Sequence, residues 1–497
     1  MTGALPVLLA IPAAGAAVLA LAPVSDRVAR ATGVVASAAA LVVAVVLAAQ
    51  FDYGAAGRLQ DVVNVGWLPS IGVRFHLGVD GISLPLVLLT ALLTLLCAIH
   101  TVGSTPEPGR PRHLLALVLV LELGVLGTFV AADLIVFFVF FEIVLIPMYF
   151  LINVWGGPAR HVAAVKFILY TLLGSALMLV GFLVIYSQAG TFDMVRLGRA
   201  HGAQISSGVQ LMAFVLLMLG FGIKSPMWPL HTWLPDAHTE APTVGSVLLA
   251  GVLLKMGTYG LIRIAVDEVP DGARRAAPAL AILAVVGIVY AALACLAQRD
   301  LKRLVAFSSV GHMGFVLLGI ATLTPIGLQA ALIGNVAHGV ITGLLFFLAG
   351  AIKDRAHTGV LTELGGLRET APGLAGVLGY AAIASLGLPG LAGFWGEAFA
   401  VVAALRRNGP LWTVLAVLAA LGAALAAAYF LRLLRQVTHG PPTLAAAGLA
   451  PPGGRLAGAE LFAWSPLVVL ALLLGVLPAV VLNAAADAAR ALAGVVR

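Results

Sequence analysis

Charged side chains are scarce in this chain. Asp, Glu, Lys and Arg make up only 10% of its 497 residues, whereas 61% are hydrophobic. A soluble domain carries about 25% charged residues, so the composition excludes a protein with much water-soluble mass. The net charge of +7 then belongs to loops at a membrane surface, and it does not indicate nucleic-acid binding.

Cysteine and lysine are also rare. The two cysteines, Cys97 and Cys295, are far apart and each lies in an apolar stretch. Because there is no CxxC motif and no Cys/His cluster, we expect no disulfide framework, zinc site or iron–sulfur cluster. Only five lysines stand against 23 arginines, in a chain rich in Ala and Gly. That usage is typical of a GC-rich bacterial genome and predicts a bacterial cell (inner) membrane as the location.

Long apolar stretches are what the chain has in abundance. A span needs about 20 mainly apolar residues, and the first stretch, 5–21, follows no basic segment, so we expect a retained span and no cleaved signal peptide. An all-α polytopic membrane protein is predicted, with about fourteen transmembrane helices. An even number puts both termini on one face, and the weak Lys/Arg bias of the loops places them on the non-cytoplasmic side. The predicted spans are roughly 3–22, 31–50, 82–101, 113–131, 133–153, 163–187, 208–240, 243–266, 277–297, 303–321, 326–351, 374–405, 411–432 and 464–483.

Two connections are longer and more polar than the others. Residues 51–80 alternate between apolar and polar side chains and predict a small hairpin on one face. Residues 433–463 are rich in Pro, Gly and Ala and predict a loop.

Helix breakers interrupt two of the predicted spans. Pro226 and Pro229 break the seventh span, and Pro389 with Gly390 breaks the twelfth. Non-helical backbone at membrane depth is tolerated only against protein or a water-filled cavity, and paired breaks indicate inverted repeats around a site at the midplane. We therefore predict two inverted five-helix repeats. The predicted units are 1–112 (spans one to three and the hairpin), 113–266 (the first repeat), 277–432 (the second repeat) and 433–497 (loop, last span and tail).

Three charged residues fall inside predicted spans of the first repeat. A charge at the bilayer centre costs roughly 2.5–3.5 kcal/mol on insertion scales, so Glu142, Lys224 and Lys255 need partners or water. Lys224 directly precedes the break and is the natural partner of Glu142. Lys255 is too central to reach a headgroup easily, although neutralisation or snorkelling along its stem is the alternative. For Lys166, a few residues into its span, snorkelling is the better explanation.

The second repeat adds His312, His338 and Glu397, all within predicted spans. A histidine exchanges protons near neutral pH because its ordinary pKa is about 6.5, whereas a single buried histidine is more often a structural hydrogen-bonded residue. Two histidines on consecutive spans favour a proton relay. The series Glu142, Lys224, Lys255, His312, His338 and Glu397 predicts a proton path across the protein rather than a binding pocket.

Further polar residues are candidates for auxiliary roles. Glu122 is a second membrane carboxylate, and a helix–helix hydrogen bond explains it equally well. His231 and His238, with Asp236 and Glu240, follow the first break and suggest a proton entrance, although capping and hydration account for the two acids about as well.

These residues stand in long motifs. "KSPMWPLHTWLPDAHTEAPTVGSVLLAGVLLKMGTYG" resembles the signature of the antiporter-like subunits of respiratory complex I and of multisubunit cation/proton antiporters. "FFVFFEIVLIPMYFLI", "RDLKRLVAFSSVGHMGFVLLG" and "GLPGLAGFWGEAF" are similar to further blocks of that family. The resemblance covers about residues 80–435. Glu397 in the twelfth span, where L- and N-type subunits typically carry Lys, favours the M-type subunits of NADH:quinone oxidoreductase, as does the short chain after span fourteen.

The resemblance implies a proton-translocating subunit whose redox chemistry lies elsewhere. Glu142 and Lys224 would form the coupling ion pair, Lys255 the central relay and Glu397 the terminal residue, with His312 and His338 connecting them. The chain itself would bind no cofactor, because NADH, FMN, iron–sulfur clusters and quinone belong to partner subunits. Its partners would be the L and N antiporter-like subunits and membrane lipids. The alternatives are a subunit of a cation/proton antiporter or of a membrane-bound hydrogenase, and a structural spacer of the membrane arm.

Overall fold

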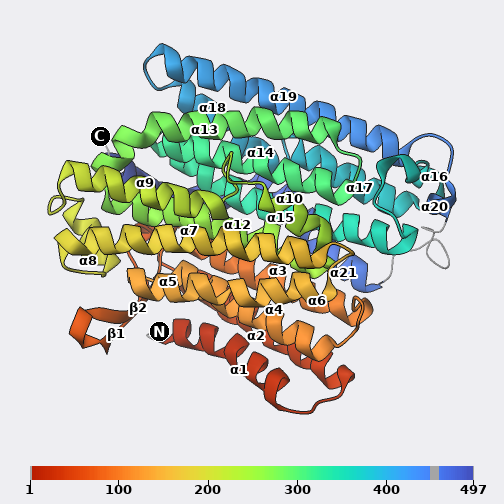
Figure 1. The fold of residues 1–497 in the computed structure, drawn as a ribbon, viewed down its shortest axis with the longest axis horizontal. Helices are drawn as coiled ribbons and strands as arrows, with labels where there is room; N and C mark the ends of the chain where they lie inside the picture. The colour runs from red at the N-terminus through yellow and green to blue at the C-terminus, as the bar shows by residue number, and fades with distance from the viewer. Residues whose placement is uncertain (1–2, 448–457, 496–497) are drawn as a thin grey trace.

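The computed structural model describes residues 3–447 and 458–495, and long helices lying side by side make up most of it (Figure 1). Within these residues, thirteen helical segments are long and apolar enough to cross a membrane. Two shorter apolar helices, Pro372–Ser385 and Gly393–Leu405, together form one broken span. The predicted all-α polytopic fold with about fourteen spans is thereby confirmed.

The N-terminal part consists of three spans and a two-stranded hairpin. The strands are antiparallel, with Val63 opposite Leu77 and Val65 opposite Phe75, so residues 51–80 hold the predicted hairpin. We call the end of the bundle that carries it the hairpin face and the opposite end the far face. The described part of the chain begins and ends at the hairpin face (Figure 1). The elements are α1 (Ala4–Leu21), α2 (Asp26–Gln50), η1 (Tyr53–Ala55), β1 (Gln60–Leu68), η2 (Pro69–Ile71), β2 (Val73–Val79) and α3 (Leu84–Gly103).

The next group contains the first predicted break. It separates α9 from α10. Two irregularities were not predicted: Val144 separates α5 from α6, and π-helical turns flank α12 on both sides. The elements are α4 (Pro111–Val130), α5 (Leu134–Ile143), α6 (Leu145–Trp155), α7 (Arg160–Ala189), α8 (Met194–Ala200), α9 (Ser207–Lys224), α10 (Trp233–Glu240), α11 (Thr243–Leu248), η3 (Leu249–Leu253), α12 (Leu254–Gly260) and η4 (Leu261–Val266).

The remaining elements contain the second predicted break, between α17 and α18. They are α13 (Pro270–Ala297), α14 (Leu301–Ala321), α15 (Pro325–Ala356), η5 (Leu361–Glu363), α16 (Leu367–Thr370), α17 (Pro372–Ser385), α18 (Gly393–Leu405), α19 (Pro410–Thr438), α20 (Leu444–Ala447), α21 (Gly458–Val476) and α22 (Ala479–Val495).

The C-terminal boundaries differ from the prediction. The loop predicted at 433–463 is shorter, because α19 continues to Thr438 and α21 already begins at Gly458; residues 448–457 lie outside the described part. A helix continues past its apolar stretch when long basic side chains such as Arg435 extend away from the apolar region. The last span ends at Val476, not near 483, since Pro478 separates it from the amphipathic α22.

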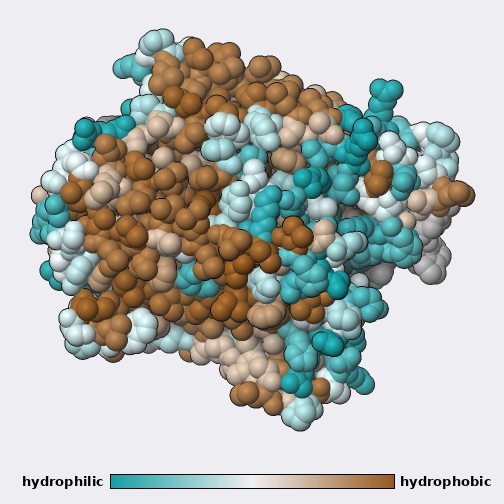
Figure 2. Space-filling view, in the orientation of Figure 1, coloured by the Kyte–Doolittle hydropathy of each residue, from teal (hydrophilic) through white to brown (hydrophobic). Residues whose placement is uncertain are grey.

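Burial shows where the centre of the bundle lies. In the most apolar stretches of spans eight and eleven, 94% of the residues are buried, compared with 33% in α2. The outer helices present an apolar surface, and hydrophilic atoms gather toward the two ends (Figure 2). The candidate residues Lys255 and His338 therefore lie on the two most enclosed spans.

Candidate functional site

The seventh span is broken directly after Lys224. Pro226 and Pro229 lack an N–H and exclude a straight helix, and the Trp233 indole N–H donates at 3.0 Å to a backbone carbonyl of α9 that the break leaves free. Lys224 is only 2% exposed. Its ammonium has no hydrogen-bond partner in the described structure and lies 4.7 Å from the centre of the Phe141 ring. The ring face therefore stabilises the buried cation.

Glu142 lies next to that ring, at the end of α5. One of its carboxylate oxygens is buried without a hydrogen bond to any described residue. Its charge acts on Lys224, but no ion pair within 4.0 Å joins the two among the described residues, since Lys224 lies against Phe141 instead. The direct contact expected from the sequence is thus absent in this conformation, and the pair remains a prediction for another one.

Lys255 lies at the centre of the bundle and is completely buried. The π-helical η3 precedes α12 and changes the regular backbone hydrogen bonding there, and the Lys255 ammonium donates to the Ala250 carbonyl of that segment. Its Nζ also lies 2.5 Å from Nδ1 of His338 on α15. Thr258, one turn further along, donates to Asn335 at 2.9 Å and so fixes α12 against α15. These contacts place a lysine and an imidazole within proton-transfer distance.

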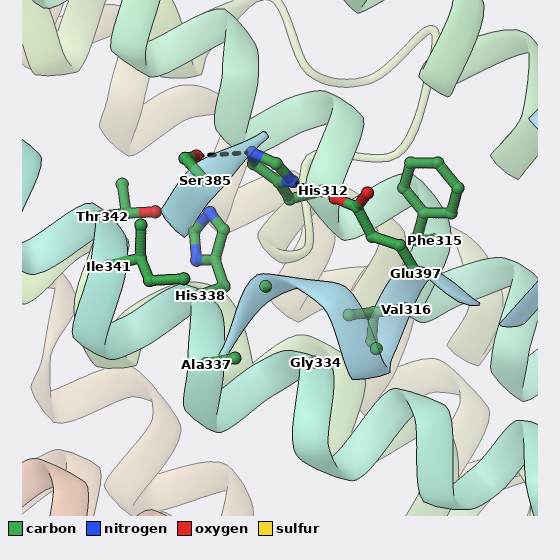
Figure 3. A pocket seen from close by; sticks show the side chains of 12 residues that line it. His312, Phe315, Val316, Gly334, Ala337, His338, Ile341, Thr342, Ser385 and Glu397 are labelled. Carbon is green, nitrogen blue, oxygen red and sulfur yellow. Dashed lines mark hydrogen bonds and ion pairs between the residues drawn. The ribbon is translucent and has the colours of Figure 1, made fainter. Parts of the chain in front are cut away.

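Residues of α14, α15 and α18 continue this chain of contacts. The His338 and His312 rings are 5.8 Å apart between centroids. His312 Nδ1 lies 2.8 Å from Oε1 of Glu397, and its Nε2 lies 3.0 Å from Oγ of Ser385 (Figure 3). Lys255, His338, His312 and Glu397 thus form one continuous series across four helices. In space His338 precedes His312, which reverses the order in which they occur along the chain.

The second break places Glu397 against His312. α17 ends at Ser385, and the connection to α18 contains Gly387 and Gly390 with φ angles of 81° and 94°. Such left-handed backbone favours glycine. A Cβ on Gly387 would lie 3.0 Å from Oε2 of Glu397, so this glycine also leaves room for the carboxylate.

A small cavity lies beside the two histidines. His312, His338, Ser385, Glu397 and Thr342 all contribute to its wall (Figure 3). It offers about 30 Å³ to the centres of water molecules, and one water needs roughly 10–15 Å³ by that measure and polar partners. The cavity is therefore large and polar enough to hold water beside the two rings.

The auxiliary candidates lie in different surroundings. Glu122 Oε2 is 3.5 Å from the Ser37 hydroxyl of α2, which fits the helix–helix alternative. His231 lies against the rings of Tyr290 and Phe307. His238 is fully buried, its ring stacks on Phe346 at 4.3 Å, and neither ring nitrogen bonds to another described residue.

Asp236 and Glu240 have structural partners. Asp236 bonds to Lys166 at 2.7 Å and to Arg303 at 3.0 Å, which joins α10 to α7 and α14. Glu240 accepts from the backbone N–H of Ala159, the residue before α7, at 2.9 Å. Ion pairing and capping therefore explain these acids, and Lys166 is held by an ion pair and not only by snorkelling.

The sequence analysis missed Lys302. Its position near the start of α14 resembles that of an interfacial lysine, yet it is 5% exposed and donates to the Ala241 carbonyl at 3.0 Å. It lines a cavity of about 200 Å³ at the far face, together with Glu240, Lys353 and Asp354. The only signal in the sequence was the rarity of lysine: because the chain has only five, each one is a candidate for a functional position.

A second group of charged residues missed by the sequence analysis lies at the hairpin face. Arg263, at the end of span eight, forms a 3.0 Å ion pair with Asp80 beside the hairpin. Glu268 is 1% exposed, and neither of its carboxylate oxygens has a partner within the described residues. Burial raises the pKa of the Glu268 carboxyl well above its usual range, and neighbouring Asp267 adds to the rise. In residues 3–447 and 458–495, no group of three His, Cys, Asp or Glu side chains is placed to hold a metal ion.

Comparisons with known proteins agree with this architecture. A model of the family described as NADH:quinone oxidoreductase/Mrp antiporter, transmembrane, matches residues 131–422. The chain is 40% identical over 496 residues to NADH-quinone oxidoreductase subunit M of Rhodobacter capsulatus, covering 97% of this chain and 94% of that one. It is 44% identical over 386 residues to an NAD(P)H-quinone oxidoreductase chain 4 of Trichormus variabilis, covering 77% and 71%.

Solved structures give the same result. A chain in the structure of respiratory complex I from Thermus thermophilus with bound NADH has a TM-score of 0.87 and 32% identity, covering 99% of this chain and 100% of that chain. A chain of the Mrp complex from Dietzia sp. shares the fold, with a TM-score of 0.85 at 24% identity, covering 99% and 97%. The chain belongs to the family of NADH:quinone oxidoreductase and Mrp antiporter membrane subunits. Within that family, its similarity over nearly the full length is to subunit M of NADH-quinone oxidoreductase.

Proposed function

We propose that this chain is the M-type proton-translocating subunit in the membrane arm of an NADH:quinone oxidoreductase. One observation carries the proposal: Lys255, His338, His312 and Glu397 lie in sequence across the enclosed centre of the bundle, with contacts of 2.5 Å and 2.8 Å at its two ends. Buried ionisable groups inside a membrane protein are costly, and they mark ion pathways and proton relays.

The contacts support the following path for a proton. Lys255 passes its proton to Nδ1 of His338, and the cavity that both histidines line has room for a water that carries it on, by way of the Ser385 hydroxyl, to Nε2 of His312. His312 then donates through Nδ1 to Glu397. Each imidazole accepts at one nitrogen and releases from the other, which a histidine can do near neutral pH.

Glu142 and Lys224 are proposed to control this relay. Like charges repel one another, so the proposal is that movement of the Lys224 ammonium changes how firmly Lys255 holds its proton. In this proposal the Lys224 side chain has two positions. In this structure it lies over the Phe141 ring, and in the other position it would contact Glu142. When Lys224 moves toward Glu142 its repulsion of Lys255 falls, and when it moves back Lys255 releases its proton.

The chain would lie in a bacterial cell membrane with both termini outside the cytoplasm. Its partners would be the L- and N-type subunits. Redox cofactors and quinone would be bound by other subunits. A subunit of a cation/proton antiporter or a membrane-bound hydrogenase is the second candidate, and co-purification of the complex distinguishes it. A structural spacer is disfavoured, because apolar side chains at these buried positions would cost less.

The test compares Lys255→Arg with Lys255→Ala in the intact complex, reconstituted into vesicles. Arg keeps the positive charge but does not release its proton. A relay therefore predicts that both variants assemble and that both lose most of their membrane-potential formation. A purely structural cation predicts that Arg restores it, and full restoration by Arg would overturn the relay.

A further inference from the structure

A cavity of about 770 Å³ opens at the hairpin face, away from the series of residues described above. Its walls come from the hairpin and the residues on either side of it, the segment that contains the short helix α8, the end of span eight and the C-terminal helix α22. The last segment of span eight, η4, ends at Val266 beside this cavity. The cavity therefore lies where the membrane-spanning segments meet the headgroup region.

The charged side chains of the wall are mostly basic. Arg58 and Arg199 are exposed, and within the described residues neither has an acidic partner within 4.0 Å. Arg263, deeper in the wall, is paired with Asp80 at 3.0 Å. Asp267 is the acid that lines the cavity, and it interacts with Arg263 and the neighbouring His201.

Two other charged pairs lie near the cavity. His76 in its wall lies 3.2 Å from Asp193, and Asp487 on α22 bonds to Arg490. Among the described residues that line the cavity, the two arginines without an acidic partner, Arg58 and Arg199, lie on separate segments, the turn before β1 and α8.

Aliphatic side chains also line the cavity. The amphipathic α22 contributes Ala488, Leu492 and Val495, and the chain at the start of β1 contributes Leu59 and Val62. A site for a small hydrated anion gains nothing from aliphatic lining. Basic and aliphatic groups in one cavity match a molecule that is itself charged at one end and apolar at the other.

We propose that this cavity binds an anionic membrane lipid through its phosphate group. Arg58 and Arg199 hold the phosphate oxygens, because a guanidinium donates two parallel hydrogen bonds to a phosphate. The apolar side of α22 covers the glycerol end of the acyl chains. The lipid thereby connects the hairpin, α8 and α22, three elements that belong to different parts of the chain.

The test measures lipid retained by the purified intact complex. Wild type and an Arg58→Ala/Arg199→Ala variant are delipidated in detergent and incubated with phosphatidylglycerol, phosphatidylcholine or inorganic phosphate, and bound lipid is counted by native mass spectrometry. Arg196→Ala is the matched control, because Arg196 lies exposed on the same short α8 but does not line the cavity.

We expect wild type and Arg196→Ala to retain one more phosphatidylglycerol per complex than the double variant, and phosphatidylcholine not to replace it. Equal retention by the double variant would overturn the proposal. Displacement of the lipid by inorganic phosphate at equal concentration would show a free-anion site instead. Loss of a neighbouring subunit from the double variant, without loss of lipid, would show that the cavity is a subunit contact. None of these outcomes depends on proton pumping, so they do not test the proposed function.

Discussion

Glu142 is proposed to control the relay through its effect on Lys224. Its side chain is half-buried near Lys224, although the two are not in contact in this conformation. Glu142→Gln removes the charge and keeps the shape, so Lys224 has no reason to leave the Phe141 ring. A change of ~1.4 kcal/mol shifts a proton equilibrium tenfold, and we expect pumping in sealed vesicles to fall at least about tenfold while the complex still assembles. Unchanged pumping would remove Glu142 from the mechanism.

Glu397 is tested by the identity of its acid group. Glu397→Gln keeps a hydrogen bond to His312 but has no proton to exchange, whereas Glu397→Asp keeps the acid and shortens the side chain by one methylene. If Glu397 receives protons from His312, the Asp variant pumps faster than the Gln variant, and the difference is measured as acidification of sealed vesicles per quinone reduced. Equal rates would assign Glu397 a packing role.

At the scale of single elements, the connection between α17 and α18 determines where Glu397 lies. Gly387→Ala would place a side chain in left-handed backbone, which costs roughly 1–2 kcal/mol, and its Cβ would meet the Glu397 carboxylate at 3.0 Å. We expect pumping to fall severalfold with assembly retained. Gly379→Ala on α17 is the control, since its Cβ would meet nothing within 4 Å, and equal effects of the two substitutions would contradict this role.

Some of these elements could be predicted and others could not. Pro226, Pro229, Pro389 and Gly390 predicted both breaks, because helix breakers act through local backbone chemistry that the sequence states directly. The π turns beside Lys255 carry no such signal: "SVLLAGVLLKMGTYG" contains only residues that an α-helix accepts.

The site residues show the same limit. Their place within apolar stretches predicted burial, and Lys224, Lys255, His338 and Glu397 are buried, whereas Glu142 and His312 are half-buried. Their contacts did not follow, because the order Lys255, His338, His312 depends on how α14 and α15 pack and not on chain order. For the same reason Lys302 was overlooked: its burial comes from neighbouring helices and not from its own span.

At the scale of the whole molecule, the hairpin face contains a group that makes stability depend on pH. Glu268 is surrounded by Asp267, Asp133, Asp193 and Arg263, and burial raises its pKa well above the usual range. The folded chain therefore holds a proton that the unfolded chain loses above about pH 4.3. Its contribution to stability is complete below that pH and is lost as the pH rises through the raised folded value.

The matching substitution is Glu268→Gln, which stays neutral at every pH. We expect the thermal unfolding midpoint of the wild-type complex to fall on going from weakly acidic to alkaline pH, and that of the variant to fall less. Asp52→Asn, at an exposed position of the same face, serves as the control. Parallel curves for wild type and Glu268→Gln would show that the carboxyl does not hold a proton in the folded chain.

The π turns that flank Lys255 have a consequence for chain length. Span eight contains 24 residues, which would extend about 36 Å as an uninterrupted α-helix, and the wider turns of η3 and η4 take up residues without adding length in proportion. Deleting one residue from η3 would let an ordinary α-helical turn close in its place, with Lys255 still facing His338. The contact that would change is local, because the Ala250 carbonyl that accepts from Lys255 lies inside η3. This span therefore tolerates a change of length at η3 better than a change in the backbone that the lysine contacts.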